Sequence, residues 1–147
     1  MARALDEARA AATRGEVPVG ATIASAEGVV IAAAGNRSRE LTDPTAHAEI
    51  LAIRAAAAAL GNERLTGCVL FVTLEPCAMC AAAIAHARIA RLVYGAADPK
   101  SGGVDHGARV FSHPQAHHVP EVVGGVGAAA AAALLTGFFQ GLRRPGP

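Results

Sequence analysis

The stretch CVLFVTLEPCAMCAAAIAHARIARLVYG, residues 68–95, indicates the fold more clearly than any other part of this sequence. It opens with a continuous apolar run of strand length (68–74), continues as a helical segment (77–88) and ends in a second strand-like run (89–95). A strand, a helix and a strand in direct succession are typical of a βαβ unit, whose helix crosses one face of a sheet. We therefore expect an α/β protein.

The flanking segments extend this pattern in both directions. The sequence predicts a helix over 2–14, a β-hairpin over 17–36, a helix over 43–62, a polar loop over 98–118, a short strand over 120–125 and an alanine-rich helix at the end. Such an order predicts three layers, α/β/α, in which helices cover both faces of a mixed central sheet of about five strands. No linker divides the chain, so we expect one domain over residues 1–147.

The bulk composition excludes several classes of protein. A formal charge of +1 over 147 residues is not the strongly basic balance of a protein that coats nucleic acid. The first residues mix charges and lack the apolar core of a signal peptide, so we expect a cytoplasmic protein. Residues 122–142 are long enough to span a membrane, but they contain five glycines. Their larger apolar residues form one helical stripe, which predicts a surface helix packed on the core and no membrane span: Leu134, Leu135, Phe138, Phe139 and Leu142.

Two of the three cysteines, Cys77 and Cys80, form a C-x-x-C at the predicted junction of strand and helix. An odd number of cysteines argues against a disulfide framework. Taken alone, C-x-x-C at this junction fits either thioredoxin-like redox chemistry or a metal site, because a helix N-terminus stabilises thiolates in both cases.

The stretch DPTAHAEI, residues 43–50, favours the metal site. His47 and Glu49 are two positions apart, a spacing that points side chains to nearly opposite sides of a mid-helix. With Asp43 or Thr45 as the helix cap, His47 lies in the first turn and can project toward the two cysteines. One histidine and two cysteines leave a fourth zinc position for water, and Glu49 then fits as the group that carries the proton.

The segments HAE (47–49) and PCAMC (76–80) together resemble the zinc-dependent nucleoside and nucleobase deaminases. EVPVGA, the Asn of AGNR, LFVTLEPCAMCAAAI, YGAADPKSG and LLTGFF are similar to the bacterial tRNA-specific adenosine deaminases, which convert the wobble adenosine of an anticodon to inosine. The likeness extends over nearly the whole chain. It implies a cytidine-deaminase-like fold, a homodimer and one Zn²⁺ per subunit, with the anticodon loop of tRNA as partner.

The resemblance also implies roles for individual positions. His47, Cys77 and Cys80 would hold zinc, and Glu49 would be the catalytic residue. The substrate-binding set comprises Asn36, which would hydrogen-bond the base, Val19, which would pack on it, the backbone N–H groups of Ala48 and Cys77, and Pro76. Contacts to RNA are expected from Asp98, Lys100, Arg143 and Arg144.

Three other readings stay open at this stage. A deaminase of free cytosine, cytidine or guanine would use the same metal site, and the near-neutral charge does not separate it from an RNA-directed enzyme. A non-catalytic zinc or RNA-binding module would need no Glu49. His113 and His117 could pair with the cysteines as a zinc finger, but the gap from Cys80 is far longer than the usual dozen or so residues.

Overall fold

The computed structural model describes residues 1–143, in which five strands form one sheet in the order β2-β1-β3-β4-β5. The strands are β1 (Gly20–Ala24), β2 (Val30–Gly35), β3 (Val69–Leu74), β4 (Arg91–Ala96) and β5 (Glu121–Val123). The helices are α1 (Ala2–Thr13), α2 (Ala48–Leu60), α3 (Ala78–His86) and α4 (Ala128–Arg143), with a short 3-10 helix, η1 (Val110–Ser112).

The sheet is mixed, as the sequence predicts. Strand β1 pairs antiparallel with both β2 and β3, whereas β3, β4 and β5 run parallel. The unit β3-α3-β4 is the predicted βαβ crossover. Because the carboxyl end of β3 leads directly into α3, the residues between them are held at one edge of the sheet.

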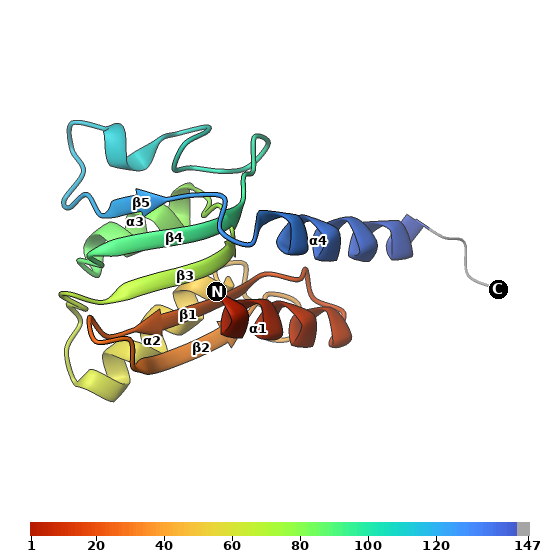
Figure 1. Ribbon diagram of the computed structural model, residues 1–147, viewed down its shortest axis with the longest axis horizontal. Coiled ribbons are helices and arrows are strands. Elements are labelled where there is room, and N and C mark those ends of the chain that lie inside the picture. Colours follow the sequence, from red (N-terminus) through yellow and green to blue (C-terminus); the bar gives the residue numbers. More distant parts are fainter. Residues whose placement is uncertain (144–147) are drawn as a thin grey trace.

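Helices cover both faces of the sheet and complete the three predicted layers (Figure 1). Helix α2 packs on β1 and β2 and also contacts α3, on the face that holds the main hydrophobic core. Helices α1 and α4 contact each other on the opposite face, where α1 lies on β1 and β2 and α4 lies on β4. The candidate site lies at the edge of the sheet, where the carboxyl end of β3 meets the starts of α2 and α3.

Small residues allow α1 to lie very close to the sheet. Ala4, Ala8 and Ala11 are fully buried on its inner face. A Cβ atom at Gly20 of β1 would overlap with the backbone of Ala4 and Ala8. The high alanine content therefore supports tight packing of helix on strand in a chain that has no Trp and one Tyr.

The start of α2 differs from the prediction. The helix begins at Ala48 and has His47 as its N-cap, so neither Asp43 nor Thr45 caps it and His47 precedes the first turn. Asp43 instead stabilises the preceding turn, because its Oδ1 accepts hydrogen bonds from the backbone N–H of Thr45 at 2.8 Å and from its hydroxyl at 2.7 Å. This Asx turn competes with helix formation at these residues.

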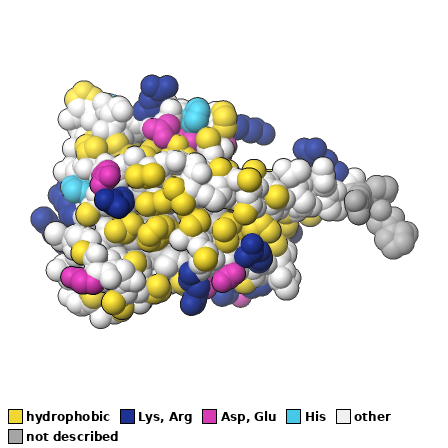
Figure 2. Space-filling model, viewed as in Figure 1, with side chains coloured by type: hydrophobic (Ala, Val, Ile, Leu, Met, Phe, Trp, Pro, Cys, Tyr) yellow, Lys and Arg dark blue, Asp and Glu magenta, His cyan; other side chains and the backbone are white. Residues whose placement is uncertain are grey.

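Helix α4 is also only partly as predicted. Ala131 is buried, but the apolar stripe farther along the helix is not packed on the core: Leu134, Leu135 and Phe138 are half-buried, and Phe139 and Leu142 are exposed. The reason is the extent of the sheet, because the C-terminal half of α4 projects past it (Figure 1). The space-filling view from the same side also shows hydrophobic side chains on the surface near the middle of the molecule (Figure 2). Among the described residues, no helix has the length and apolar character needed to cross a membrane.

Candidate functional site

The N-termini of α2 and α3 converge on one point, and each cap residue is a predicted metal ligand. His47 caps α2 and Cys77 caps α3, both with extended backbones at ψ 154° and 174°. Cys80 lies one turn along α3 from Cys77. Because a helix N-terminus carries a partial positive charge, this arrangement favours thiolates at the site.

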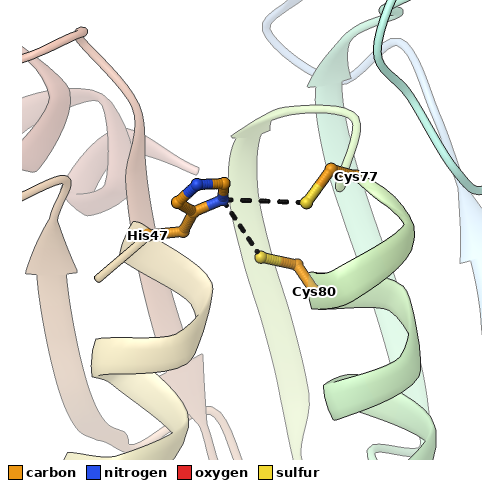
Figure 3. A group of neighbouring side chains, drawn as sticks. All are labelled: His47, Cys77 and Cys80. Atoms are coloured by element: carbon orange, nitrogen blue, oxygen red, sulfur yellow. Dashed lines mark hydrogen bonds between the residues drawn. The ribbon is translucent and has the colours of Figure 1, made fainter. Parts of the chain in front are cut away.

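The three side chains meet closely enough to hold one metal ion. The imidazole of His47 points toward both thiols (Figure 3), with its Nδ1 at 3.7 Å from Sγ of Cys77 and 3.5 Å from Sγ of Cys80. All three ligand atoms lie within 4.8 Å of one another. Zinc bonds of about 2.0 Å to nitrogen and 2.3 Å to sulfur place the two atoms about 3.5 Å apart across a tetrahedral angle. The donor set and its spacing therefore fit zinc.

The pKa values of the two thiols are shifted in opposite directions by their surroundings. Hydrogen bonding from Cys80 lowers the pKa of the Cys77 thiol to about 4. The hydrogen bond to Cys77, together with burial, raises the pKa of Cys80. The hydrogen bond to Cys77 also raises the pKa of His47. A metal cation would remove the competition for protons, since it needs both sulfurs deprotonated and the imidazole neutral.

Glu49 is the second residue of α2, and its side chain is buried beside this group, with a relative exposure of 4%. Burial raises the pKa of the carboxyl group above its usual value. A buried carboxyl group with a raised pKa, next to a metal position, is suited to accepting and returning a proton. The spacing of His47 and Glu49 now has a physical reason, because His47 is an extended cap and not a helical residue.

A cavity of about 270 Å³ opens over the group. Among the predicted site residues it is lined by Val19, Asn36, His47, Ala48, Glu49, Cys77 and Asp98. Sequence reasoning missed five further lining residues: Val17, Ser38, Leu74, Glu75 and Ser101. Leu74 and Glu75 directly precede Pro76, and Ser38 lies two residues after Asn36. Their closeness in sequence to predicted site residues could have identified them as lining residues.

The remaining predicted residues lie around the cavity. Pro76 is buried, and its carbonyl oxygen accepts the N–H of Gly103 at 2.8 Å. Lys100 is exposed and lines a neighbouring cavity of about 420 Å³, which shares Val17, Leu74, Asp98 and Ser101 with the first. Arg143 is exposed at the end of α4, and Arg144 lies outside the described residues. His113 and His117 line a different cavity with His86, and in the described part of the chain they belong to no metal-binding group.

Glu75 organises the loop that forms one wall of the cavity. Its side chain is fully buried and accepts backbone N–H groups from Asp98, Val104, Asp105 and His106 at 3.0–3.2 Å. Its Oε1 also lies 2.7 Å from Nδ1 of His106. Burial opposes ionisation of the carboxyl group, but these hydrogen bonds prevail and lower its pKa. Both ends of the 98–106 loop are therefore fixed to one carboxylate.

Known proteins resemble this chain in both sequence and fold. The family model for the cytidine and deoxycytidylate deaminase zinc-binding region matches residues 1–96. The tRNA-specific adenosine deaminase of Agrobacterium fabrum strain C58 is 57% identical over 140 residues, which are 95% of this chain and 91% of the relative.

Two solved structures are similar to the whole fold. One comes from work on A-to-I editing by tRNA:A34 deaminases at the wobble position of transfer RNA; it is 58% identical with a TM-score of 0.90, and the match covers 92% of this chain and 97% of that one. The other is a guanine deaminase from Nitrosomonas europaea, 27% identical with a TM-score of 0.80, for which the match covers 93% of this chain and 81% of the other.

Proposed function

Because this chain belongs to the family of cytidine and deoxycytidylate deaminases with a zinc-binding region, we propose that it is a hydrolytic deaminase that converts the wobble adenosine of a tRNA anticodon to inosine. One observation carries the chemistry. A His-Cys-Cys group that fits zinc lies beside a buried carboxyl group at the floor of a cavity. The adenosine substrate is supported by the 57% identity to a tRNA-specific adenosine deaminase.

His47, Cys77 and Cys80 would hold one zinc ion per chain. Zinc, when bound there, would supply the Lewis acidity that makes water a nucleophile near neutral pH. Glu49 takes a proton from the attacking water and delivers it to N1 of the adenine base, while the oxygen of the water bonds to C6. Glu49 then assists the departure of ammonia, so that adenosine and water give inosine and ammonia.

The rest of the cavity would hold the base. Asn36 would hydrogen-bond it and Val19 would pack on one face, while the free backbone N–H of Ala48 at the start of α2 would face it from the floor. Pro76 would shape the floor from beneath. An anticodon loop already presents unpaired bases, so placing one in this cavity costs only a few kcal/mol. Asp98, Lys100, Arg143 and Arg144 would contact the neighbouring RNA.

Two further proposals concern the setting of the enzyme. We expect a homodimer, in which α3 lies close to the partner subunit, as the family resemblance implies. Sedimentation equilibrium of the full chain would measure its mass directly. We also expect it to act in the cytoplasm, where a tRNA substrate is present.

A guanine deaminase is the second candidate. The structural similarity to the Nitrosomonas europaea guanine deaminase favours it, since that protein has the same fold over most of this chain. Such an enzyme would use the same metal group and would differ in how the cavity admits its substrate.

One assay separates the two candidates. The zinc-loaded protein is incubated with an anticodon stem-loop carrying A at the wobble position and, separately, with free guanine, cytosine and cytidine. We expect inosine in the stem-loop and no turnover of the free compounds; a stem-loop with G at the same position is the control. Turnover of a free base with no inosine in the RNA would contradict the tRNA assignment.

A further inference from the structure

Glu16 is a buried carboxylate that lies outside the metal group and behind the cavity wall. Its relative exposure is 2%, and it follows α1 at the start of the segment that leads into β1. Its Oε1 accepts the backbone N–H of Glu40 at 2.8 Å, and its Oε2 accepts that of Arg39 at 3.3 Å. It is not among the residues that line the cavity.

The same carboxylate also contacts the side chain of Asn36. The Nδ2 atom of Asn36 donates to Oε2 of Glu16 at 3.4 Å. On the other side of the amide, the hydroxyl of Ser38 donates to Oδ1 of Asn36 at 3.2 Å. A carboxylate accepts hydrogen bonds and donates none, so the amide nitrogen of Asn36 has to be the atom that faces Glu16. The amide therefore has one defined orientation.

This orientation determines what Asn36 offers to a ligand. One N–H of its amide is directed at Glu16 and one lone pair of its oxygen accepts the Ser38 hydroxyl, so the second N–H is the remaining donor of the amide at the cavity that Asn36 lines. A donor in this place pairs with an acceptor atom on a base. Where that acceptor is missing, the buried N–H is left without a partner and binding is weakened.

We propose that Glu16 is a positioning residue for substrate specificity: it fixes the Asn36 amide so that an N–H, and not the oxygen, meets the base. The inference rests on the proposed deamination of adenosine. Adenine has ring acceptors at N1, N3 and N7, and N1 receives the proton from Glu49. Of the other two, N3 lies on the edge of the base beside the glycosidic bond, where the RNA backbone leads away, whereas N7 flanks C6 on the opposite edge. The acceptor that Asn36 reads is therefore N7.

The experiment compares two stem-loops that differ at one atom. One carries adenosine at the wobble position and the other carries 7-deazaadenosine, in which C–H replaces N7. The ratio of kcat/KM for the two substrates is measured for the zinc-loaded wild type and for Glu16→Gln, whose side-chain amide can present either oxygen or nitrogen to Asn36. The deaza substitution changes the reactivity of the ring equally for both enzymes, so this effect cancels when the ratios are compared.

We expect the preference for adenosine over 7-deazaadenosine to fall by about 10-fold in Glu16→Gln, the effect of releasing one buried hydrogen bond. In an Asn36→Ala background the same change should have no further effect on the ratio, because the residue that reads N7 is gone. Arg39→Ala is the matched control: it removes an exposed side chain from the same loop but leaves the backbone N–H on Glu16, so the ratio should match that of the wild type.

A merely structural role would lower stability and all rates together without moving the ratio. A wild-type ratio in folded, zinc-loaded Glu16→Gln would therefore overturn the role of Glu16. If this variant does not fold, Glu16→Asp takes its place, because its shorter side chain withdraws the carboxylate from the Asn36 amide: a reduced ratio supports the proposal and an unchanged one overturns it. Absence of turnover by the wild type on the adenosine stem-loop would instead overturn the proposed function, and the role of Glu16 with it.

Discussion

Glu49 differs from most acidic side chains of this protein in being buried without a cationic partner in the described structure. Its nearest ionisable neighbours are the members of the candidate metal group, and burial raises its pKa. A structural zinc site has no use for such a group, since the cost of burying a carboxyl group without a cationic partner is substantial. The position of this residue is therefore the main argument for catalysis over a non-catalytic zinc module.

We predict that Glu49→Gln lowers kcat for deamination by about 10²-fold or more, because the amide cannot carry the proton. Zinc content and melting temperature should stay near those of the wild type, since the substitution keeps the shape of the side chain. Steady-state kinetics with metal analysis tests this. Glu63→Gln, an exposed change just beyond α2, is the control and should leave kcat unaltered. A Glu49→Gln protein with a tenth of wild-type kcat would exclude the proposed role.

At the scale of secondary-structure elements, the close packing of α1 on β1 depends on one glycine. A methyl group at Gly20 would overlap with the backbone of Ala4 and Ala8, so Gly20→Ala has to push the helix from the sheet. We predict that it lowers the free energy of unfolding by about 1–3 kcal/mol or more, as overpacking does. Urea denaturation measures the change.

A second glycine gives a control of opposite sign. Gly137 lies within α4 and has open space around it, so Gly137→Ala should raise the stability by about 0.5–1 kcal/mol, because alanine restricts the unfolded chain. If both substitutions stabilise the protein, the close packing of α1 against Gly20 of β1 is contradicted.

The 98–106 loop is a second element held by a single side chain. We predict that Glu75→Gln speeds amide hydrogen exchange in the loop, at Asp98 or at Val104, Asp105 and His106, because the uncharged amide has one accepting oxygen and cannot serve both groups of N–H donors. Exchange followed by NMR or mass spectrometry would show this. Glu121→Gln, which removes one partner of an exposed ion pair with Arg91, should leave exchange in the loop unaffected. Unchanged exchange in Glu75→Gln would mean that other contacts hold the loop.

At the scale of the whole molecule, the metal group joins two halves of the chain. His47 belongs to α2 and the two cysteines belong to the α3 region, so a bound ion links elements that are about thirty residues apart. Binding to the folded state alone stabilises it by about 2.7 kcal/mol when free metal is 100 times its Kd. Loss of metal should therefore weaken the contact between the two helices.

We predict that chelation lowers the melting temperature of the wild type and that added Zn²⁺ restores it, with one ion bound per chain. Cys80→Ser should bind zinc much more weakly and show no such response. Cys68→Ala is the matched control, because this buried thiol is not part of the metal group and its loss should leave the zinc response intact. Differential scanning calorimetry with metal analysis provides the measurement. A melting temperature that ignores both chelator and zinc would contradict the proposed metal site.

Much of the fold and of the site followed from local patterns. The predicted helix over 77–88 corresponds to α3 (Ala78–His86), and the predicted strand over 68–74 corresponds to β3 (Val69–Leu74). The spacing of apolar residues and the positions of glycine and proline predict such elements, because the formation of a helix or strand depends on residues that are close in sequence. The metal group could be predicted for the same reason. His47 and Glu49 are close in sequence, as are Cys77 and Cys80, and the chemistry of each pair is specific to its residue types.

Only the tertiary structure decided the rest. The exposed part of α4 could not be predicted, because burial of its stripe depends on where the sheet ends. The roles of Glu16 and Glu75 were hidden because their partners are mostly backbone N–H groups 23–31 residues distant, which have no signature in the amino-acid sequence. Sequence by itself therefore determined the metal chemistry, which resides in side chains of particular types. The three-dimensional fold determined the shape of the cavity, because its walls are held by hydrogen bonds between distant segments of the backbone.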